Sequence, residues 1–296
     1  VADVLRTGLS RYLQQAPYLP AQQYAVINAI MRCKTARMGG HVYRCSSCGH
    51  RKVSYNSCRN RHCPSCQSLG RLRWVQRRLK ETLPVPYFHV VFTIPAILNP
   101  FALRNKECRD AILFRAVSET LLTLGADTRR LGAQLACITM LHTWGQNLMD
   151  HPHIHCVIAA GGITPDGTWK PAKNNSFLFP VKVMATLFRG KVLALFKQAL
   201  DSAQITLSGT LQVFHHNPGE LKKMIDALYR QEWVVYAKKP FANPQAVIKY
   251  LSNYTHRLAI SNNRIVGLTD TQVSFRWKDY REHNQQKIMT LDIAEF

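Results

Sequence analysis

Acidic residues are scarce in this sequence. It has 17 Asp and Glu against 39 Lys and Arg, which gives a formal net charge of +22 over 296 residues. Charge of that size repels itself unless a polyanion neutralises it. Nucleic acid is the partner we expect, because phosphate contacts release counterions and supply much of the affinity. The alternative is a basic globular protein with no polyanionic partner.

Long hydrophobic runs, repeats and low-complexity tracts are also lacking. No stretch approaches the roughly 20 apolar residues of a membrane helix, and Val1–Ser10 has no signal-peptide hydrophobic region. We therefore expect a cytoplasmic protein, in which the nine cysteines serve as metal ligands or buried thiols and not as disulfides. The start at Val1 and the predicted helix start at 291–296 lead us to expect a fragment of a longer protein.

The length suits one large domain and one small domain. Pro84 and Pro86 end a strongly basic predicted helix, 67–83, and mark the expected boundary. Residues 1–84 are predicted to form a helical plus zinc-ribbon-like DNA-binding module, and residues 85–296 the larger domain. In the module we expect a helix at 19–37 and short strands at 41–44 and 52–55.

Strands and helices alternate after residue 86. The predicted strands are 87–94, 134–143, 153–160, 233–237, and a hairpin of 265–266 with 273–277; the predicted helices are 99–124, 181–203, 220–230 and 243–258. This alternation favours one α/β sandwich domain.

Two CxxC pairs stand out in the basic module. Cys45-x2-Cys48 and Cys63-x2-Cys66 are correctly spaced zinc knuckles. Each knuckle directs two thiolates at one point, and two knuckles complete a tetrahedron, so the spacing predicts a structural zinc site with no open position.

Four further residues could form a second zinc site. Cys33 with His41, and Cys58 with His62, interleave with the two knuckles in a cross-braced pattern. His50 could replace one of these ligands. The alternative is that the two cysteines are buried thiols and the two histidines face solvent or phosphate.

Arginines crowd around these knuckles with few acids nearby. We expect a surface that follows a phosphate backbone rather than a merely solvated helix face. The candidate residues are Arg59, Arg61, Arg71, Arg73, Arg77, Arg78 and Lys80.

The segment His151-Pro-His153-Ile154-His155 runs into a predicted strand. Residues i and i+2 of a strand point to the same face, so His153 and His155 would present two imidazoles together. Two neutral imidazoles can bind a divalent cation and leave positions open for a phosphate oxygen. The alternative is a pair of ordinary core or surface histidines.

Tyr250 and Tyr254 lie in the predicted helix 243–258, and their i, i+4 spacing puts both hydroxyls on one face. Paired tyrosines are often core or interface aromatics, but basic residues flank these two: Lys238, Lys239, Lys249 and Arg257. A phenol attacks phosphate at neutral pH only if the electrophile is polarised, which a cation on the two histidines could do.

Together these motifs resemble the rolling-circle transposases of the insertion-sequence-91 family, which belong to the two-tyrosine HUH class. The motifs are the string CRNRHCPSCQ at 58–67, FTIP at 92–95, TWGQ at 143–146, HPHIH at 151–155 and YLSNYTHR at 250–257. The resemblance covers nearly the whole chain. The family pattern continues with a further basic segment where this sequence stops at Phe296, so the resemblance implies that the domain 85–296 is truncated at its C-terminus.

The resemblance implies an α+β fold: a ferredoxin-like or RRM-like HUH core in which an antiparallel sheet carries the HUH strand at its centre, beside the Phe92 strand. It also implies a catalytic Mg²⁺ or Mn²⁺, structural zinc, and cleavage of single-stranded or hairpin DNA ends through a 5′-phosphotyrosine. His153 and His155 match the metal ligands, and Tyr250 and Tyr254 the nucleophiles. For a third ligand we expect His256, with Gln146 as the second choice.

Two alternatives remain open from the sequence. A rolling-circle replication initiator or relaxase would share the same chemistry. A zinc-ribbon protein that binds nucleic acid without catalysis would explain the charge and the cysteines, but not the histidine and tyrosine pairs.

Overall fold

The computed structural model describes residues 1–16, 18–174, 176–241, 243–255, 258–279 and 282–296. Its contacts divide the chain into two compact units. Unit 1 comprises Val1–Arg77, Gln146–Met149 and Ser252–Phe296, and unit 2 comprises Arg78–Gly145 and Asp150–Leu251. No helix in the described part of the chain combines the length and hydropathy that a membrane span requires.

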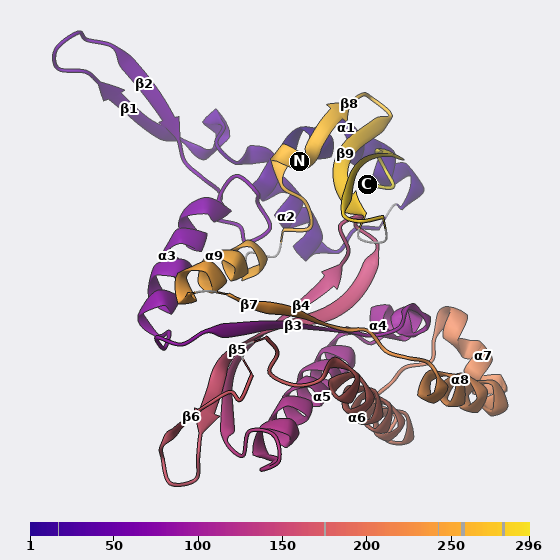
Figure 1. The fold of residues 1–296 in the computed structure, drawn as a ribbon. Coiled ribbons are helices and arrows are strands. Elements are labelled where there is room, and N and C mark those ends of the chain that lie inside the picture. Colours follow the sequence, from indigo (N-terminus) through magenta and orange to yellow (C-terminus); the bar gives the residue numbers. More distant parts are fainter. Residues whose placement is uncertain (17, 175, 242, 256–257, 280–281) are drawn as a thin grey trace. The chain divides into compact units, whose positions relative to one another are not determined.

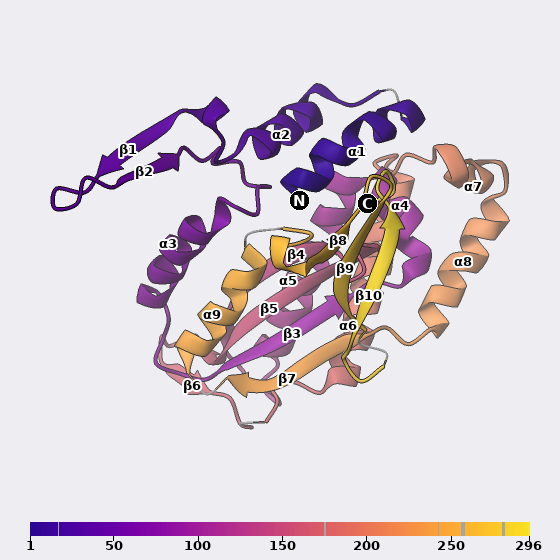
Figure 2. The ribbon, with the colours of Figure 1, turned by 90° about the horizontal axis from the view of Figure 1, so that it is seen from above.

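A five-stranded sheet forms the centre of unit 2 (Figure 2). The strands are β3 (Tyr87–Thr93), β4 (Gln134–Trp144), β5 (Asp150–Ile163), β6 (Trp169–Pro171) and β7 (Val235–Phe241). Their order is β4-β5-β3-β7, with β6 paired to β5, and all pairs are antiparallel. The predicted α+β class is confirmed, with the histidine strand inside the sheet and next to the Phe92 strand.

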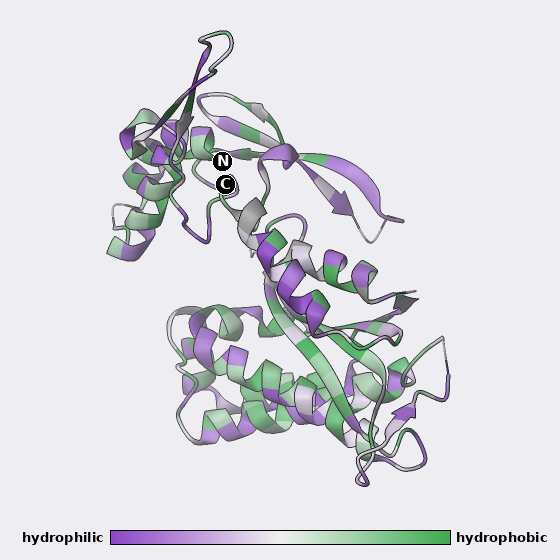
Figure 3. Ribbon diagram, turned by 90° about the vertical axis from the view of Figure 1, so that its left-hand side faces the viewer, coloured by the Kyte–Doolittle hydropathy of each residue, from purple (hydrophilic) through white to green (hydrophobic). Residues whose placement is uncertain are grey.

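One face of this sheet packs on helices. The helices of unit 2 include α4 (Asn99–Arg104), α5 (Lys106–Ala126), α6 (Val181–Asp201), α7 (Gln212–His216) and α8 (Pro218–Arg230). Alternate residues of the central strands, such as Phe92, Ile154 and Ile158, are fully buried in one core with residues of α5 and α6. Figure 3 shows the green, hydrophobic residues concentrated on these strands and helices. The intervening residues of each strand consequently point to the opposite face.

The predicted helix 99–124 is two helices. Asn105 separates α4 from α5, and its side-chain amide donates to the carbonyl oxygens of Phe101 and Thr206, while its side-chain oxygen accepts from the Thr206 backbone N–H. A polar side chain that bonds to nearby backbone groups competes with helix continuation, which explains the break.

Unit 1 is built from both ends of the chain. It contains α1 (Ala2–Gln15), α2 (Ala21–Arg32), the hairpin β1 (Gly40–Arg44) and β2 (Arg51–Tyr55), most of α3 (Gln67–Lys80), the end of α9 (Pro244–Thr255), and the antiparallel sheet β8 (Ile265–Leu268), β9 (Gln272–Asp279), β10 (Gln285–Asp292) (Figure 1). Short 3-10 turns occur at Ala36–Met38, Ala96–Leu98, Gly209–Leu211 and Asn262–Arg264.

The expected division into 1–84 and 85–296 needs correction, because the C-terminal strands pack on the N-terminal helix. Val4 of α1 shares a buried cluster with Val273, Phe275 and Ile293. A Cβ at Gly8 would lie 2.7 Å from the Ile293 side chain, so glycine permits this close approach. The strand β10 and a following turn also replace the helix start predicted at 291–296.

Phe188 makes aromatic contacts between the layers of the unit 2 core. Phe188 of α6 is fully buried, and its ring centroid lies 5.0 Å from that of Phe92 and 5.6 Å from that of Trp233. We expect Phe188→Ala to lower the free energy of unfolding by about 3–5 kcal/mol, because it leaves a cavity. The control Phe177→Ala, at a side chain that is 43% exposed, should cost less than about 1 kcal/mol. Equal losses in urea denaturation would contradict the assignment.

Candidate functional site

Three histidines meet on the face of the unit 2 sheet that is opposite the core. His153 and His155 lie on the same side of β5, as the two-residue period requires. His142 of β4 stands directly opposite His153 in the strand register. The potential ligand nitrogens of all three lie within 4.8 Å of one another. His142 is therefore the third imidazole of the cluster, which the sequence prediction missed.

Burial favours the neutral imidazoles of His153 and His155. His142 and His155 are buried in the sheet face. Loss of hydration is the largest cause that lowers the pKa of His153 to about 4 and that of His155 to about 2, and nearby imidazoles lower both further. A neutral imidazole is the form that ligates a metal, so the cluster is ready to bind a cation at neutral pH.

Hydrogen bonds at the Nδ1 atoms define how two of the rings are held. His153 Nδ1 lies 2.6 Å from the His151 carbonyl oxygen. Because a carbonyl oxygen only accepts, Nδ1 must carry the proton and Nε2 the lone pair. His155 Nδ1 lies 2.9 Å from Nε2 of His89, a buried residue of β3. An outer partner at one nitrogen, with the other nitrogen available, is the usual arrangement of metal-binding histidines.

The third-ligand candidates from the sequence are His256 and Gln146. Gln146 lies in the β4–β5 connection, where its backbone carbonyl accepts from the Arg264 guanidinium. His256 lies outside the described residues. His142 had a sequence signal of its own: around a β-hairpin turn, residues at equal distances from the centre face each other, and His142 and His153 are such a pair.

Tyr250 extends from α9 to the same face of the sheet. Its ring centroid lies 5.0 Å from that of His89 and 5.3 Å from that of Phe241. The Lys238 ammonium lies 5.0 Å from the centre of the Tyr250 ring. Tyr254 follows one turn later in α9, but its side chain is outside the described part of the structure. The structure thus brings one of the two tyrosines next to His89, the hydrogen-bond partner of His155.

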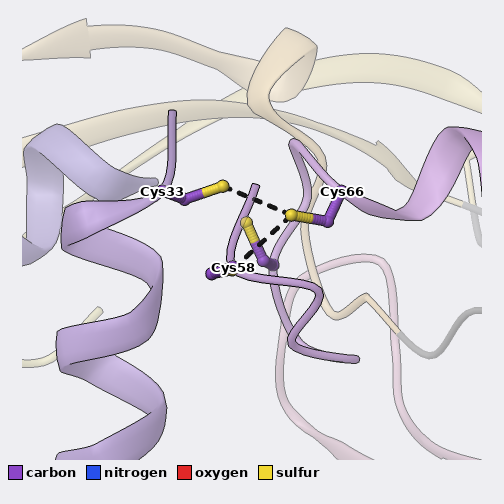
Figure 4. A group of neighbouring side chains, drawn as sticks. Cys33, Cys58 and Cys66 are labelled. Atoms are coloured by element: carbon purple, nitrogen blue, oxygen red, sulfur yellow. Dashed lines mark hydrogen bonds between the residues drawn. The ribbon is translucent and has the colours of Figure 1, made fainter. Parts of the chain in front are cut away.

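A second cluster consists of thiols in unit 1. The sulfurs of Cys33, Cys58, Cys63 and Cys66 lie within 4.8 Å of one another. Cys66 Sγ is 3.2 Å from Cys33 Sγ and 3.5 Å from Cys58 Sγ (Figure 4). Four sulfurs around a tetrahedral zinc, with bonds of about 2.3 Å, would be about 3.8 Å apart. The donor set and its spacing therefore fit one structural zinc ion.

The thiols differ in acidity. Burial raises the pKa of Cys58 and raises that of Cys63 to about 11. Burial also acts to raise the pKa of Cys66, but hydrogen bonds from Cys33 and Cys58 outweigh it and lower this pKa to about 7. Cys66 consequently becomes a thiolate, the form that binds metal, at a lower pH than Cys58 and Cys63 do.

The observed cluster corrects the predicted pairing of Cys45 and Cys48 with Cys63 and Cys66. Cys45 and Cys48 are exposed and lie in the turn of the β1–β2 hairpin. The register runs from Gly40 opposite Tyr55 to Arg44 opposite Arg51. Each strand rises about 3.3 Å per residue, so the turn lies about 13 Å from the base of the hairpin.

The structure also corrects the predicted second zinc site. Its two cysteines, Cys33 and Cys58, belong to the observed cluster, but its two histidines do not. His41 is exposed on β1, and His62 Nε2 accepts a hydrogen bond from Arg61 Nε at 3.2 Å. Several groupings of the eight candidate ligands satisfy the same spacing rules. Which four side chains lie together depends on how the chain folds between them.

The predicted DNA-contacting residues have different surroundings. Arg71 Nε donates to Ser252 Oγ at 2.9 Å, and Arg78 forms an ion pair with Glu81 at 2.6 Å. The remaining arginines lie in a stretch with no acidic residue between Asp3 and Glu81 but fifteen Lys and Arg. The Lys239 side chain and Arg257 are outside the described residues.

A zinc assay separates the observed grouping from the predicted one. We expect Cys33→Ser to remove one equivalent of zinc, measured by mass spectrometry of the purified protein, because three thiolates hold the ion less well than four. The matched variant Cys45→Ser should retain that equivalent. Loss of the same zinc in Cys45→Ser, with none lost in Cys33→Ser, would restore the original pairing.

The buried imidazoles should make stability depend on pH. Burial lowers the pKa values of His89 and His153 to about 4 and that of His155 to about 2, whereas the unfolded chain titrates near 6.5, about the ordinary value. Below that pH the unfolded state binds more protons, so stability falls as the pH falls. We expect a loss of roughly 2 kcal/mol per imidazole between pH 7 and pH 5 in urea denaturation without added divalent cations.

The control for this prediction is the double variant His153→Gln, His155→Gln. It removes two of the three titrating groups, so its stability should change less steeply over the same pH interval. A wild-type stability that is flat from pH 7 to pH 5 would contradict the prediction.

Comparison with known proteins identifies the chain's relatives. A family model described as "Putative transposase" matches residues 136–296, and one described as "Transposase zinc-binding domain" matches residues 4–94. "Putative transposase y4qJ" of Sinorhizobium fredii (strain NBRC 101917 / NGR234) is 46% identical over 296 residues, which cover 100% of this chain and 74% of that protein. The transposase for insertion sequence element IS801 of Pseudomonas savastanoi pv. phaseolicola is 28% identical over 88% of this chain and 62% of its own length.

Two solved structures are also similar to parts of this chain. They are the conjugative relaxase TrwC in complex with OriT DNA, metal-free and metal-bound, with 15% identity and a TM-score of 0.33 in both cases. The matches cover 59% and 57% of this chain, and 66% and 63% of theirs. A TM-score this low does not establish a common fold. The family models and the relative that is 46% identical along the whole chain are decisive: the chain belongs to the insertion-sequence-91 family of transposases.

Proposed function

We propose that this transposase cleaves and rejoins single-stranded DNA through a tyrosine of α9, as a two-tyrosine HUH enzyme in rolling-circle transposition. The observation that carries the proposal is a chain of contacts. Tyr250 packs edge-on against His89, and His89 hydrogen-bonds to His155 of the three-histidine cluster. A phenol and a potential metal site therefore lie on the same face of one sheet.

The three imidazoles fit a divalent cation. His142, His153 and His155 would hold it through neutral nitrogens, and no other protein ligand is needed for an open site. When bound, the cation would act as a Lewis acid on an oxygen of the scissile phosphate. An all-nitrogen set suits Mn²⁺ and later transition metals better than Mg²⁺, which prefers oxygen. Of the two expected cations, Mg²⁺ and Mn²⁺, the three nitrogen ligands therefore favour Mn²⁺.

The cleavage step needs one nucleophile and one leaving oxygen. The Oη of Tyr250 or Tyr254 attacks phosphorus, the bond from phosphorus to the 3′ oxygen breaks, and the phenolic proton is lost while the 3′ oxygen gains one. The products are a 5′-phosphotyrosine and a free 3′-OH. Rejoining reverses the step, because a 3′-OH can attack the phosphotyrosine. Two tyrosines one helical turn apart would allow two DNA ends to be held at once.

The N-terminal part of the chain would hold the DNA. The stretch from Val4 to Lys80 carries no acid, and phosphates would neutralise its positive charge. Exposed arginines of α3, such as Arg73 and Arg77, are placed to contact a backbone. We propose that a structural zinc at the four-cysteine cluster supports this module, since metal binding contributes folding free energy to small modules.

A replication initiator or a relaxase could use the same cluster and tyrosines. The match of residues 4–94 to a transposase zinc-binding domain favours transposition. A protein that only binds nucleic acid would not need three converging imidazoles on the sheet face that Tyr250 contacts. The relatives named above are longer than this chain, so the activity of the complete protein is part of the proposal.

Tyrosine substitutions test the chemistry directly. Incubation of the protein with Mn²⁺ and a single-stranded oligonucleotide from an element end should give a covalent adduct on a denaturing gel. We expect the double variant Tyr250→Phe, Tyr254→Phe to abolish the adduct, because no phenolic oxygen remains to attack. Each single variant should retain one nucleophile and form less adduct.

Tyr229→Phe is the matched control. Tyr229 also lies in a helix of unit 2 with a lysine over its ring, Lys197 Nζ at 5.1 Å, but it is remote in sequence from the paired tyrosines. Its adduct should equal that of the wild type. An undiminished adduct in the double variant would remove Tyr250 and Tyr254 from the mechanism.

A further inference from the structure

We propose that His89 is a positioning residue that fixes the ring of His155 and contacts the ring of Tyr250, so that it aligns the cation site with the nucleophile. The inference rests on the function proposed above, because it concerns the same site. None of the sequence motifs pointed to His89, which lies far along the chain from all the other site residues.

The strand register brings the two imidazoles together. His89 of β3 stands opposite Val157 of β5, and His155 stands opposite Val91, so the two histidines are diagonal neighbours on one face. Their rings are nearly parallel, with an interplanar angle of 8° and centroids 5.2 Å apart. His89 Nε2 and His155 Nδ1 are 2.9 Å apart, and His89 is only 1% exposed.

This hydrogen bond contains one proton, and its position decides what His155 can do. If His89 donated, His155 would carry its own proton on Nε2 and could not ligate a cation through that atom. If His155 donates from Nδ1, Nε2 keeps its lone pair. His153 already has the second arrangement, with Nδ1 bonded to a carbonyl oxygen. A cation shared by both rings requires the same arrangement in His155, with His89 Nε2 as acceptor.

A histidine at position 89 is less favourable for stability than an apolar side chain, so filling space does not explain why His89 is there. His89 Nδ1 is buried, and no hydrogen-bond partner is found for it among the described residues. Burying an unsatisfied polar atom lowers stability, and leucine or methionine at this position would avoid that loss. A role for the other nitrogen, Nε2, accounts for why an imidazole occupies the position.

The contact with Tyr250 gives His89 a second partner across the site. The two rings meet edge-on, with centroids 5.0 Å apart and an interplanar angle of 68°. His89 is thus in direct contact with a ligand candidate on β5 and with the nucleophile candidate on α9. Loss of its ring would release both groups, although His89 itself touches neither the cation nor the phosphate in this proposal.

Cation affinity distinguishes positioning from packing. In the zinc-loaded protein, we expect His89→Leu to raise the Mn²⁺ dissociation constant, measured from the electron paramagnetic resonance signal of free Mn²⁺, by about 10–100-fold. His89→Gln supplies an amide oxygen near the position of Nε2, and it should stay within about threefold of the wild type. Val90→Ala, on the core side of the same strand, should leave the constant unchanged even though it lowers stability.

The tautomer of His155 gives a second measurement that needs no variant. In cation-free wild-type protein, long-range ¹H–¹⁵N correlation spectra should show His155 protonated at Nδ1. Protonation at Nε2 would overturn the proposal, and so would equal Mn²⁺ affinity in the wild type and His89→Leu. If His89→Leu does not fold, the tautomer and the His89→Gln result decide.

The outcomes also separate this inference from the proposed function. A wild type that binds Mn²⁺ and forms the adduct, together with an unaffected His89→Leu, would remove only His89. A wild type that binds no Mn²⁺ would overturn the cation site and the role of His89 with it.

Discussion

The two-residue period of β5 is the constraint on which the site depends. Ile154 and Ile158 must face the helices to complete the core, and this leaves His153 and His155 on the opposite face. A shift of the register by one residue would bury the imidazoles among apolar side chains and expose the isoleucines. The burial that stabilises the fold therefore also decides which face of the sheet carries the candidate ligands.

The same sheet sets the protonation state of its histidines. Neighbouring strands bring four imidazoles to one face, from β3, β4 and β5, and their burial and mutual repulsion lower the pKa values of His153 and His155. Neutral rings can share protons with carbonyl oxygens or with each other and still offer lone pairs. The positive charge of the chain is instead concentrated elsewhere, in the acid-free stretch between Asp3 and Glu81, where phosphate would be bound.

The two units of this transposase are stabilised in different ways. Unit 2 has a large core between its sheet and α5 and α6, whereas unit 1 has small clusters around α1 and around the four cysteines. A small core gives little stability, so a metal at the cysteine cluster would matter most there. The helix α9 contributes residues to both units, and its Tyr250 contacts His89 of the unit 2 sheet.

The sequence by itself determined whatever depends on neighbours along the chain. It showed His153 and His155 on one strand face, Tyr250 and Tyr254 one helical turn apart, the basic character, the cysteine-rich module and the family. Only the tertiary structure decided which segments meet. Cross-strand register places His142 and His89 at the site. Cys45 and Cys48 lie in the turn of the β1–β2 hairpin, so Cys33 and Cys58 are the thiols that cluster with Cys63 and Cys66. The C-terminal strands belong to unit 1 because they pack on α1. The periodicity of a strand or helix can be read from consecutive residues. Contacts between distant segments depend instead on how those segments bury apolar surface against one another.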